Sequence, residues 1–453
     1  MPDHPTPEDE AAAEREAGRL SPVPPVPGMA TQESGVSGLL RRAAIDLTPL
    51  RRHRDFRLLM AGQSVTFLGS MITYVALPYQ AYQLSGSSLV VGLLGVAELL
   101  PLLVAAFLGG ALADARDRRR MLQLTELSFA AGSTILLVNA VIPSPQLWLL
   151  FVVSAGMAAV DGLQRPSLEA LIPRLVDRDE LTAAAAISTV RFTIGMILGP
   201  AVGGLLIAVI GLPATYGVDV ATFLVSLATL RLMQAAPPPV EDAEVSLSSI
   251  AEGVRYAASR QVLMGTYVVD IVAMFFGMPM ALFPAFAKEF GGADVLGLMY
   301  AAPAVGSLLA TVTSGWSGQV RRHGAAICVA AAGWGAAIVA VGVAPNLALV
   351  LLGLALAGGA DTVSGIFRST VWNQTIPDEL RGRLAGIEQV SYSTGPLLGN
   401  VESGIAASLI GVRGAIVSGG ALCVVGVLAV GLALPAFRRY DATAEPAPDP
   451  TPA

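Results

Sequence analysis

The chain has 453 residues, of which 54% are hydrophobic and only 14% are charged, and its net charge at pH 7 is −6. A soluble domain carries roughly 25% charged residues. The composition therefore excludes a disordered chain, a collagen-like chain, a nucleic-acid binder and an ordinary soluble enzyme. We expect a protein that crosses a membrane several times.

Residues 1–50 are predicted to form a disordered cytoplasmic tail, because their first part is rich in Pro, Glu, Ala and Ser. Acids and prolines stand where a signal peptide needs an apolar run, so we do not expect one. Residues 438–453, also rich in proline, predict a second disordered cytoplasmic tail.

Twelve apolar stretches lie between the tails, each long enough for a helix of about 20 residues that spans a bilayer. They lie near residues 57–82, 89–113, 121–142, 147–171, 182–210, 213–234, 261–287, 294–319, 325–344, 346–372, 383–410 and 412–437. The predicted fold class is an all-α membrane protein with two six-helix halves, residues 51–234 and 261–437. The polar segment 235–260, with three consecutive prolines, is predicted to be a cytoplasmic linker.

Arginine-rich loops alternate along the chain with loops that carry little charge beyond Lys288 and Arg413. Basic loops stay on the cytoplasmic side of a membrane. This alternation predicts an even number of spans, with both termini and all the arginine-rich loops in the cytoplasm.

An internal repeat supports the division into two parallel halves. Several residues recur 200 positions later: Gly195 as Gly395, Gly199 as Gly399, Gly204 as Gly404, and Asp161 as Asp361. Such repeats are typical of transporters with a central site between two halves.

The end of the second span carries Gly-Ala-Leu-Ala-Asp followed by a basic run. This segment resembles the signature loop of the major facilitator superfamily, although Ala115 and Asp117 replace its first arginine and its glycine. The resemblance implies a gating motif formed by Gly110, Leu112, Asp114, Arg116, Arg118 and Arg119. The plainer alternative is that these arginines only anchor the loop in the cytoplasm.

The fifth span has small residues at every fourth position, which give a smooth face for close helix packing. They are Gly195, Gly199, Pro200, Gly203 and Gly204. This pattern resembles the fifth-helix motif that drug and proton antiporters of the superfamily share, and the resemblance implies export. Ordinary helix packing is the alternative.

Further segments resemble the enterobactin exporter branch of the superfamily, to which macrolide efflux proteins lie close. They include Asp161-Gly162, Thr189-Val190-Arg191, Leu298-Met299-Tyr300-Ala301-Ala302 and Ile376-Pro377. The resemblance implies a siderophore-like substrate, with a macrolide or other hydrophobic drug as the alternative.

Charged residues inside membrane spans are rare and indicate function. We expect Glu98, Asp270 and Asp361 to be the candidates for binding a proton or substrate, because no arginine lies close to them in sequence. We expect Asp161, Arg165, Arg191 and Arg368 to form a structural or gating charge network. For any one carboxylate, a hydrogen bond between helices is an equally good interpretation.

Aromatic residues follow the first and seventh spans, which line the central cavity in the superfamily. The resemblance implies that Phe67, Tyr74, Tyr267, Phe275 and Phe276 line this cavity. The alternative is that they face lipid or lie in interfacial aromatic belts.

Together these features predict a monomeric transporter in a bacterial plasma membrane that exports an amphipathic small molecule by proton antiport with alternating access. Its expected partners are the lipid bilayer, the substrate and protons, with no nucleic acid. The only lysine, Lys288, lies outside any P-loop pattern, and no HExxH or Cys/His cluster occurs. We therefore expect no enzyme activity, no metal and no cofactor. Two alternatives remain: a proton-independent transporter or flippase, and a non-transporting scaffold or sensor.

Overall fold

The computed structural model describes residues 46–115, 117–234, 255–377 and 381–442, with only the backbone at 107–115, 381–383 and 385–391. The chain divides into two compact units, residues 1–46 and 47–453, and every element below belongs to the second. Among the described residues the chain is helical, and its only β contact is an isolated bridge between Arg322 and Asp441.

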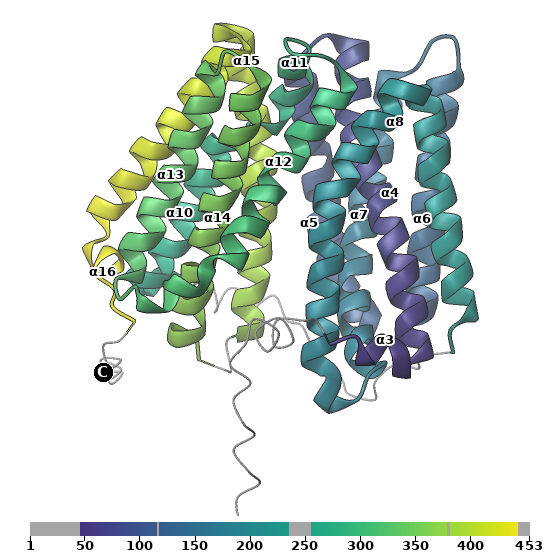
Figure 1. Ribbon diagram of the computed structural model, residues 1–453, viewed down its shortest axis with the longest axis horizontal. Coiled ribbons are helices and arrows are strands. Elements are labelled where there is room, and N and C mark those ends of the chain that lie inside the picture. Colours follow the sequence, from purple (N-terminus) through teal and green to yellow (C-terminus); the bar gives the residue numbers. More distant parts are fainter. Residues whose placement is uncertain (1–45, 116, 235–254, 378–380, 443–453) are drawn as a thin grey trace, which may run out of the picture. The chain divides into compact units, whose positions relative to one another are not determined.

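The first group of helices gathers on one side of Figure 1. It consists of α3 (Thr48–Arg52), α4 (Arg54–Ser85), α5 (Ser88–Ala115), α6 (Arg118–Val141), α7 (Leu147–Leu171) and α8 (Leu181–Leu232), with 3₁₀ turns η1 (Ile172–Arg174) and η2 (Arg178–Glu180) before α8. Local signals set several ends: Gly86 closes α4 in the left-handed conformation, and the Asp117 carboxylate accepts hydrogen bonds from two backbone amides at the start of α6.

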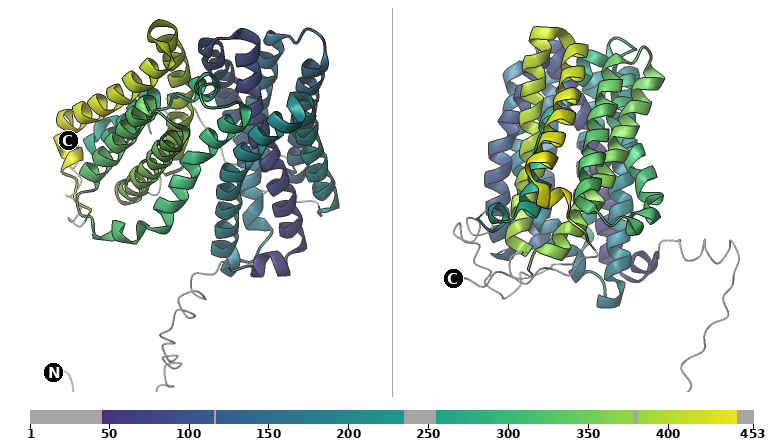
Figure 2. Two further views of the ribbon diagram at one scale, coloured as in Figure 1. Left: turned by 45° about the horizontal axis from the view of Figure 1, so that its top comes forward. Right: turned by 90° about the vertical axis from the view of Figure 1, so that its left-hand side faces the viewer.

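The second group lies on the other side of Figure 1, and the left view of Figure 2 shows the same grouping from a further direction. It consists of α10 (Gln261–Gly277), η3 (Met280–Leu282), α11 (Phe283–Ala287), α12 (Ala293–Val312), η4 (Ser314–Gln319), α13 (His323–Val343), α14 (Leu347–Thr375), α15 (Arg381–Ala433) and α16 (Pro435–Arg438). The Asn346 side chain caps α14 by accepting from the amide of Leu349 at 3.0 Å.

Helix α8 reverses direction at Gly211, where the backbone has φ 79° and ψ 166°. Its first arm runs parallel to α4, since Gly195 packs on Phe67 and Gly203 on Ile72. Its second arm runs antiparallel to α4: Asp219 accepts from Thr73, whereas Ser226 and Thr229 pack on Gly62. A straight helix of 52 residues would be about 78 Å long, far more than the roughly 30 Å of a bilayer core.

Helix α15 repeats this reversal at Gly411, with the same backbone angles, φ 79° and ψ 166°. Its first arm packs Gly399 on the backbone of Phe275, and its second arm packs Gly426 on Val272. Ten helices of the described part are long and apolar enough to cross a membrane, and α8 and α15 are two of them. If both arms of each cross, the total is twelve, and this number stays a prediction.

Glycine-to-backbone contacts join the two groups of helices. At one crossing α5 of the first group meets α15 of the second, where Gly92 packs on the carbonyl of Asn400 and Gly404 packs on Leu89. At the equivalent place α8 meets α12, where Gly204 and Gly297 lie backbone to backbone. Both crossings lie near the end of the helices that carries Gly86, Gly211 and Gly411, which we call the hairpin end; the opposite end, where α4 and α6 begin, is the arginine end.

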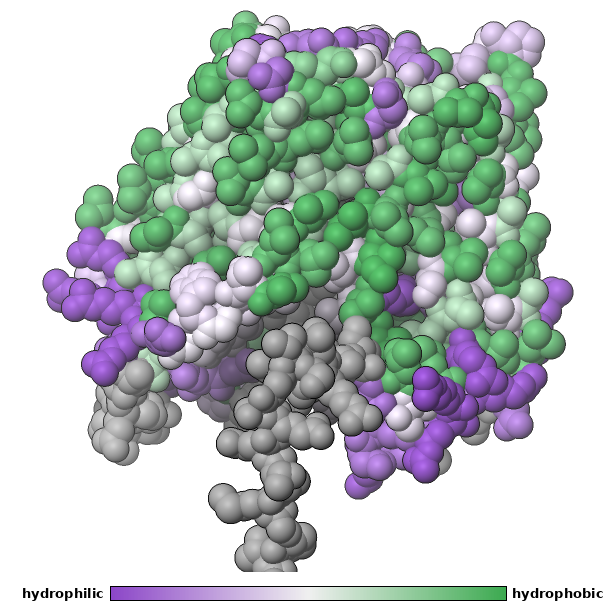
Figure 3. Space-filling model, viewed as in Figure 1, coloured by the Kyte–Doolittle hydropathy of each residue, from purple (hydrophilic) through white to green (hydrophobic). Residues whose placement is uncertain are grey.

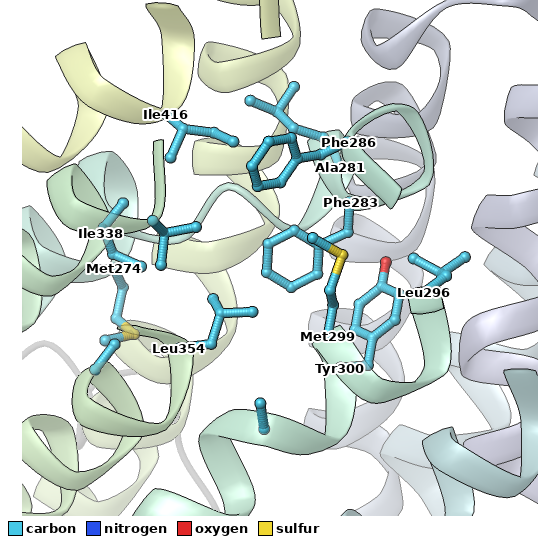
Figure 4. Close-up of a cluster of buried hydrophobic side chains, with 14 of the residues drawn as sticks. Met274, Ala281, Phe283, Phe286, Leu296, Met299, Tyr300, Ile338, Leu354 and Ile416 are labelled. Carbon is cyan, nitrogen blue, oxygen red and sulfur yellow. The ribbon is translucent and has the colours of Figure 1, made fainter. Parts of the chain in front are cut away.

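The molecular surface is apolar over the middle of the helices and hydrophilic toward the arginine end, as Figure 3 shows for one face. Large apolar side chains in the middle of helices, such as Leu100, Leu198 and Leu356, are exposed. Inside, Figure 4 shows the cluster that packs around Phe283, Met299 and Tyr300. An apolar exterior over an apolar interior is what a membrane-spanning bundle requires, because lipid replaces water as the solvent.

Candidate functional site

A buried ion set connects α10, α14 and α15 in the second group of helices. Arg368 is only 2% exposed, and its guanidinium contacts Asp270 of α10 and lies 3.5 Å from a carboxylate oxygen of Asp361. The ring of Tyr392 lies 5.4 Å from the same guanidinium. Asp361 remains 39% exposed, so one side of the set is open.

This set unites residues that the sequence assigned to different roles. Asp270 and Asp361 were expected to act away from any arginine, and Arg368 was assigned to the charge network. The structure places Arg368 between the two carboxylates. The arginine and its two carboxylates together carry a net charge of about −1. A proton can neutralise that charge without breaking both ion pairs.

The other members of the predicted charge network lie in the first group of helices. On α7 the Arg165 guanidinium pairs with Asp161 at 3.0 Å. Arg191, on the first arm of α8, donates to the backbone carbonyl of Gln63 at 3.3 Å and lies 5.4 Å from the centre of the Phe67 ring. In the described residues the network therefore falls into separate parts, and its gating role stays a prediction.

Glu126 of α6 is a buried carboxylate that the sequence reasoning missed. It is 0% exposed and accepts hydrogen bonds from Gln63 at 2.7 Å, Gln164 at 3.2 Å and Thr66 at 3.3 Å. No basic side chain among the described residues forms an ion pair with it. The signal was available, since an acidic residue interrupts the apolar stretch 121–142.

Glu98 and Asp219 show two further environments for carboxylates. Glu98 lies partly buried on α5 and has no ion pair within the described part of the chain. Asp219 is fully buried and accepts from the hydroxyls of Thr73 at 2.5 Å and Ser133 at 2.6 Å. Asp219 therefore suits a structural hydrogen bond between helices, as its position near a helix end suggests, whereas Glu98 remains a candidate for proton binding.

The small residues of the fifth-span motif divide between two neighbours. Gly195, Gly199 and Gly203 pack on Phe67, Met71 and Ile72 of α4, whereas Pro200 and Gly204 meet Gly297 of α12. One helix thus packs closely against its own group and against the other group. Close backbone approach is what small residues permit in membranes.

The gating motif is only partly described. Gly110, Leu112, Asp114 and Arg116 lie outside the residues whose side chains the structure describes. Arg118 donates to the carbonyl of Ala170 at 2.7 Å, and Arg119 donates to the carbonyls of Leu230 and Arg231, both at 2.7 Å. These arginines bind the carboxyl ends of α7 and α8, where the helix dipole favours a cation.

The predicted cavity-lining aromatics occupy different surroundings. Phe67 stands 5.2 Å from Phe192, and Tyr74 donates to the Met280 sulfur at 2.9 Å and packs edge-on against Tyr300 at 5.2 Å. On α10, Tyr267 is buried and stacks on Trp372 at 5.4 Å, and Phe275 contacts Phe276 at 4.9 Å. Tyr74 thus joins the two groups of helices near the hairpin end, whereas Tyr267 packs inside its own group.

One group of side chains could hold a metal ion by distance alone. His53, Asp177 and Glu180 bring three potential ligand atoms within 4.8 Å of one another. However, the His53 ring nitrogen already lies 2.8 Å from one Glu180 oxygen, and Arg52 lies 3.2 Å from the other. We interpret this cluster as an ion-paired link between the start of α4 and the segment before α8.

Comparison with known proteins gives consistent matches over nearly the whole chain. The family described as transmembrane secretion effector matches residues 44–452. The enterobactin exporter of Shigella boydii serotype 4 is 28% identical over 401 residues, covering 88% of this chain and 96% of its own. The enterobactin exporter of Citrobacter koseri is 28% identical over 410 residues, covering 90% of this chain and 98% of its own.

Solved structures share the fold at low identity. A transporter of the POT family in complex with 5-aminolevulinic acid aligns with a TM-score of 0.67 at 11% identity, over 85% of this chain and 97% of its own. A bacterial homologue of the human lysosomal transporter Spinster aligns with a TM-score of 0.66 at 14% identity, over 87% and 98%. These likenesses show the arrangement of the helices.

Proposed function

This chain belongs to the transmembrane secretion effectors of the major facilitator superfamily, and from that premise we propose that it exports an amphipathic small molecule. It is a membrane transporter, so its surroundings are the lipid bilayer and its cargo is a small molecule. The observation that carries the direction of transport is the likeness to enterobactin exporters over 88% of the chain. A siderophore-like compound is accordingly the first candidate substrate.

Alternating access is supported by the way the two groups of helices meet. Their glycine crossings, α5 with α15 and α8 with α12, lie at the hairpin end. Rocking of the two groups closes a central site at the hairpin end, where these crossings lie, and opens it toward the arginine end, or the reverse. We propose that the arginine end faces the cytoplasm, together with both tails and the linker 235–260, and that the halves 51–234 and 261–437 move as units of a monomer.

Proton antiport is supported by the membrane carboxylates. A proton that binds Asp361 removes one negative charge beside Arg368 and leaves the Asp270 pair in place. Asp361 is 39% exposed, so a hydrogen-bond donor of the cargo can reach the same carboxylate, and proton and substrate then compete for it. Glu98 and Glu126 are further positions where a proton can bind without breaking a described ion pair. The chemistry of transport needs no covalent step, and we propose that the protein is not an enzyme.

The substrate is best identified by comparing spent medium and cell extract by mass spectrometry, for wild type and a deletion strain under iron starvation. We expect a metabolite that binds ferric iron to be lost from the medium and retained in the deleted cells. Matching profiles contradict export of an endogenous siderophore. Drug efflux, tested with a panel of toxic compounds, then becomes the leading account.

The coupling ion is tested in liposomes with an acidic lumen and the metabolite outside. We expect wild type to accumulate the metabolite and the triple variant Glu98→Gln, Asp270→Asn, Asp361→Asn to lose gradient-driven accumulation. Glu289→Gln is the matched control, because Glu289 pairs with Arg413 at 2.8 Å on the exposed surface. Undiminished accumulation by the triple variant rules out these carriers, and equal accumulation without a gradient indicates a proton-independent transporter.

A further inference from the structure

The first arm of α8 presents side chains in rows spaced by four residues, which form ridges along a helix. One row packs on α4 through Gly195 and Gly199. A second row, Ile194, Leu198 and Val202, is exposed and apolar, as expected for a lipid-facing surface. Two faces of the arm are thus taken by α4 and by lipid. The remaining faces can point toward the other group of helices.

Phe192 lies on the row that faces the other group. This row continues through Pro200 and Gly204, which meet Gly297 of α12. Phe192 stands roughly two turns, or about 12 Å, from Pro200 toward the arginine end. Its ring is 50% exposed and stands 5.2 Å from the ring of Phe67 on α4, so one side of the ring is open.

Tyr392 occupies the same place in the second group, 200 residues later in the sequence. Its row on α15 continues through Asn400 and Gly404, which meet α5. Tyr392 is 39% exposed, and its ring lies beside the guanidinium of Arg368. Each group of helices therefore presents an aromatic ring with an arginine close to it.

The two arginines differ in how their charge is balanced. Arg368 contacts two carboxylates. Arg191 has no carboxylate partner among the described residues; it donates to the Gln63 carbonyl, and its buried Nε–H has no acceptor. Glu126 contacts the same residue, because it accepts a hydrogen bond from the side-chain amide of Gln63 at 2.7 Å. An uncompensated guanidinium within a membrane span is costly, and an oxyanion is the partner it fits best.

We propose that Arg191, Phe67 and Phe192 form a subsite for a planar aromatic anion, such as an aryl carboxylate or a phenolate. The oxyanion binds the guanidinium, and the aromatic ring stacks on Phe192, which stands 5.2 Å from Phe67. Tyr392 offers a second ring on the facing group of helices. Because Nε is covered in this conformation, the guanidinium shifts toward the ligand as it binds. This inference names a substrate class and rests on the proposed export function.

The test is equilibrium binding of three matched probes to the purified full chain in detergent: naphthoate, its neutral amide and the saturated carboxylate with the same carbon skeleton. We expect naphthoate to bind wild type about tenfold more tightly than either analogue, which corresponds to about 1.4 kcal/mol. Arg191→Gln abolishes the preference for naphthoate over the amide, and Arg191→Lys retains part of it. Phe192→Leu abolishes the preference for naphthoate over the saturated acid.

Thermal unfolding of each variant checks that it is folded. Phe129→Leu is the control substitution, because it changes a stacked pair with Phe223 inside the first group of helices. That control should keep both preferences. The subsite is disproved if wild type binds the three probes equally or binds none, or if Arg191→Gln keeps the preference for charge. Since binding needs neither a gradient nor transport, a failure of proton antiport leaves this result unaffected, and the two failures are distinguishable.

Discussion

At the scale of single residues, the carboxylates inside the spans fall into two kinds of environment. Asp270 and Asp361 share Arg368, whereas Glu126 and Asp219, within the described part of the chain, accept from neutral amides and hydroxyls. Arg368 holds the first kind by charge, whereas amide and hydroxyl groups hold the second kind by hydrogen bonds alone. The first kind suits a change of partners when a proton binds, and the second suits a fixed link between helices or a further position for a proton.

Glu126→Ala should destabilise the protein, because it leaves the buried amide of Gln63 and the half-buried amide of Gln164 without this acceptor. Each such group costs about 1–3 kcal/mol. Glu126→Gln keeps the volume and one carbonyl acceptor, so it should unfold close to wild type while gradient-driven transport falls. Thermal unfolding in detergent and liposome uptake separate the two effects, and an alanine variant as stable as wild type would show that these bonds contribute little.

The sequence predicted the helices far better than the polar site. Apolar length and glycine spacing are local properties, and they located the spans and the glycine face of α8. The partners of Arg368 lie on other helices, and nothing in the sequence near Asp270 indicates that an arginine of α14 reaches it. Glu126 was overlooked because a single acid in an apolar stretch changes its mean hydropathy little. The side chains of Gly110, Leu112, Asp114 and Arg116 lie outside the described residues, so their gating role stays a prediction.

At the scale of elements, certain glycines set how the helices turn and cross, because any side chain at these positions would strain the backbone or collide with a neighbouring helix. Gly211 and Gly411 share φ 79° and ψ 166°, a region that is essentially restricted to glycine. Gly204 and Gly297 allow the backbones of α8 and α12 to touch. Gly217, on the second arm of α8, has open space where a methyl group would stand, which makes it the matched control for both.

Gly211→Ala should lower the free energy of unfolding by about 1–3 kcal/mol through backbone strain. Gly217→Ala should leave the free energy unchanged or raise it, because alanine is favoured in helices. Denaturant titration of the two variants in detergent measures the difference. Equal stability of both variants would mean that the reversal of α8 tolerates another backbone conformation.

Gly204→Ala should impair the crossing of α8 and α12, because a Cβ atom there meets the backbone of Ala293 and Gly297. We expect transport to fall about tenfold, corresponding to about 1.4 kcal/mol of lost contact, while Gly217→Ala transports normally. Spin-label distances between α8 and α12 report whether the groups of helices separate at the hairpin end. Unchanged distances with unchanged transport would remove the crossing from the mechanism.

At the scale of the whole molecule, the two groups of helices are alike in backbone and unlike in charge. Both turn back at an equivalent glycine and present an aromatic residue at an equivalent place, Phe192 and Tyr392. The second group balances its arginine with two acids, whereas in the first group Arg191 and Glu126 both bind Gln63 and form no ion pair with each other in the described residues. This asymmetry suits the two proposed roles: the ion set of the second group binds protons, and Arg191 of the first group binds an anion.

The glycine crossings have a mechanical consequence. Where two helices meet through bare backbone, no interdigitating side chains have to be pulled apart before the helices change their angle. Such a contact lets one helix roll on the other, so the energy of the contact varies little as the angle between the helices changes. The preference between open and closed forms is then set elsewhere, by cargo, by charge and by the thickness and tension of the surrounding lipid. The same protein should therefore cycle at different speeds in membranes of different composition.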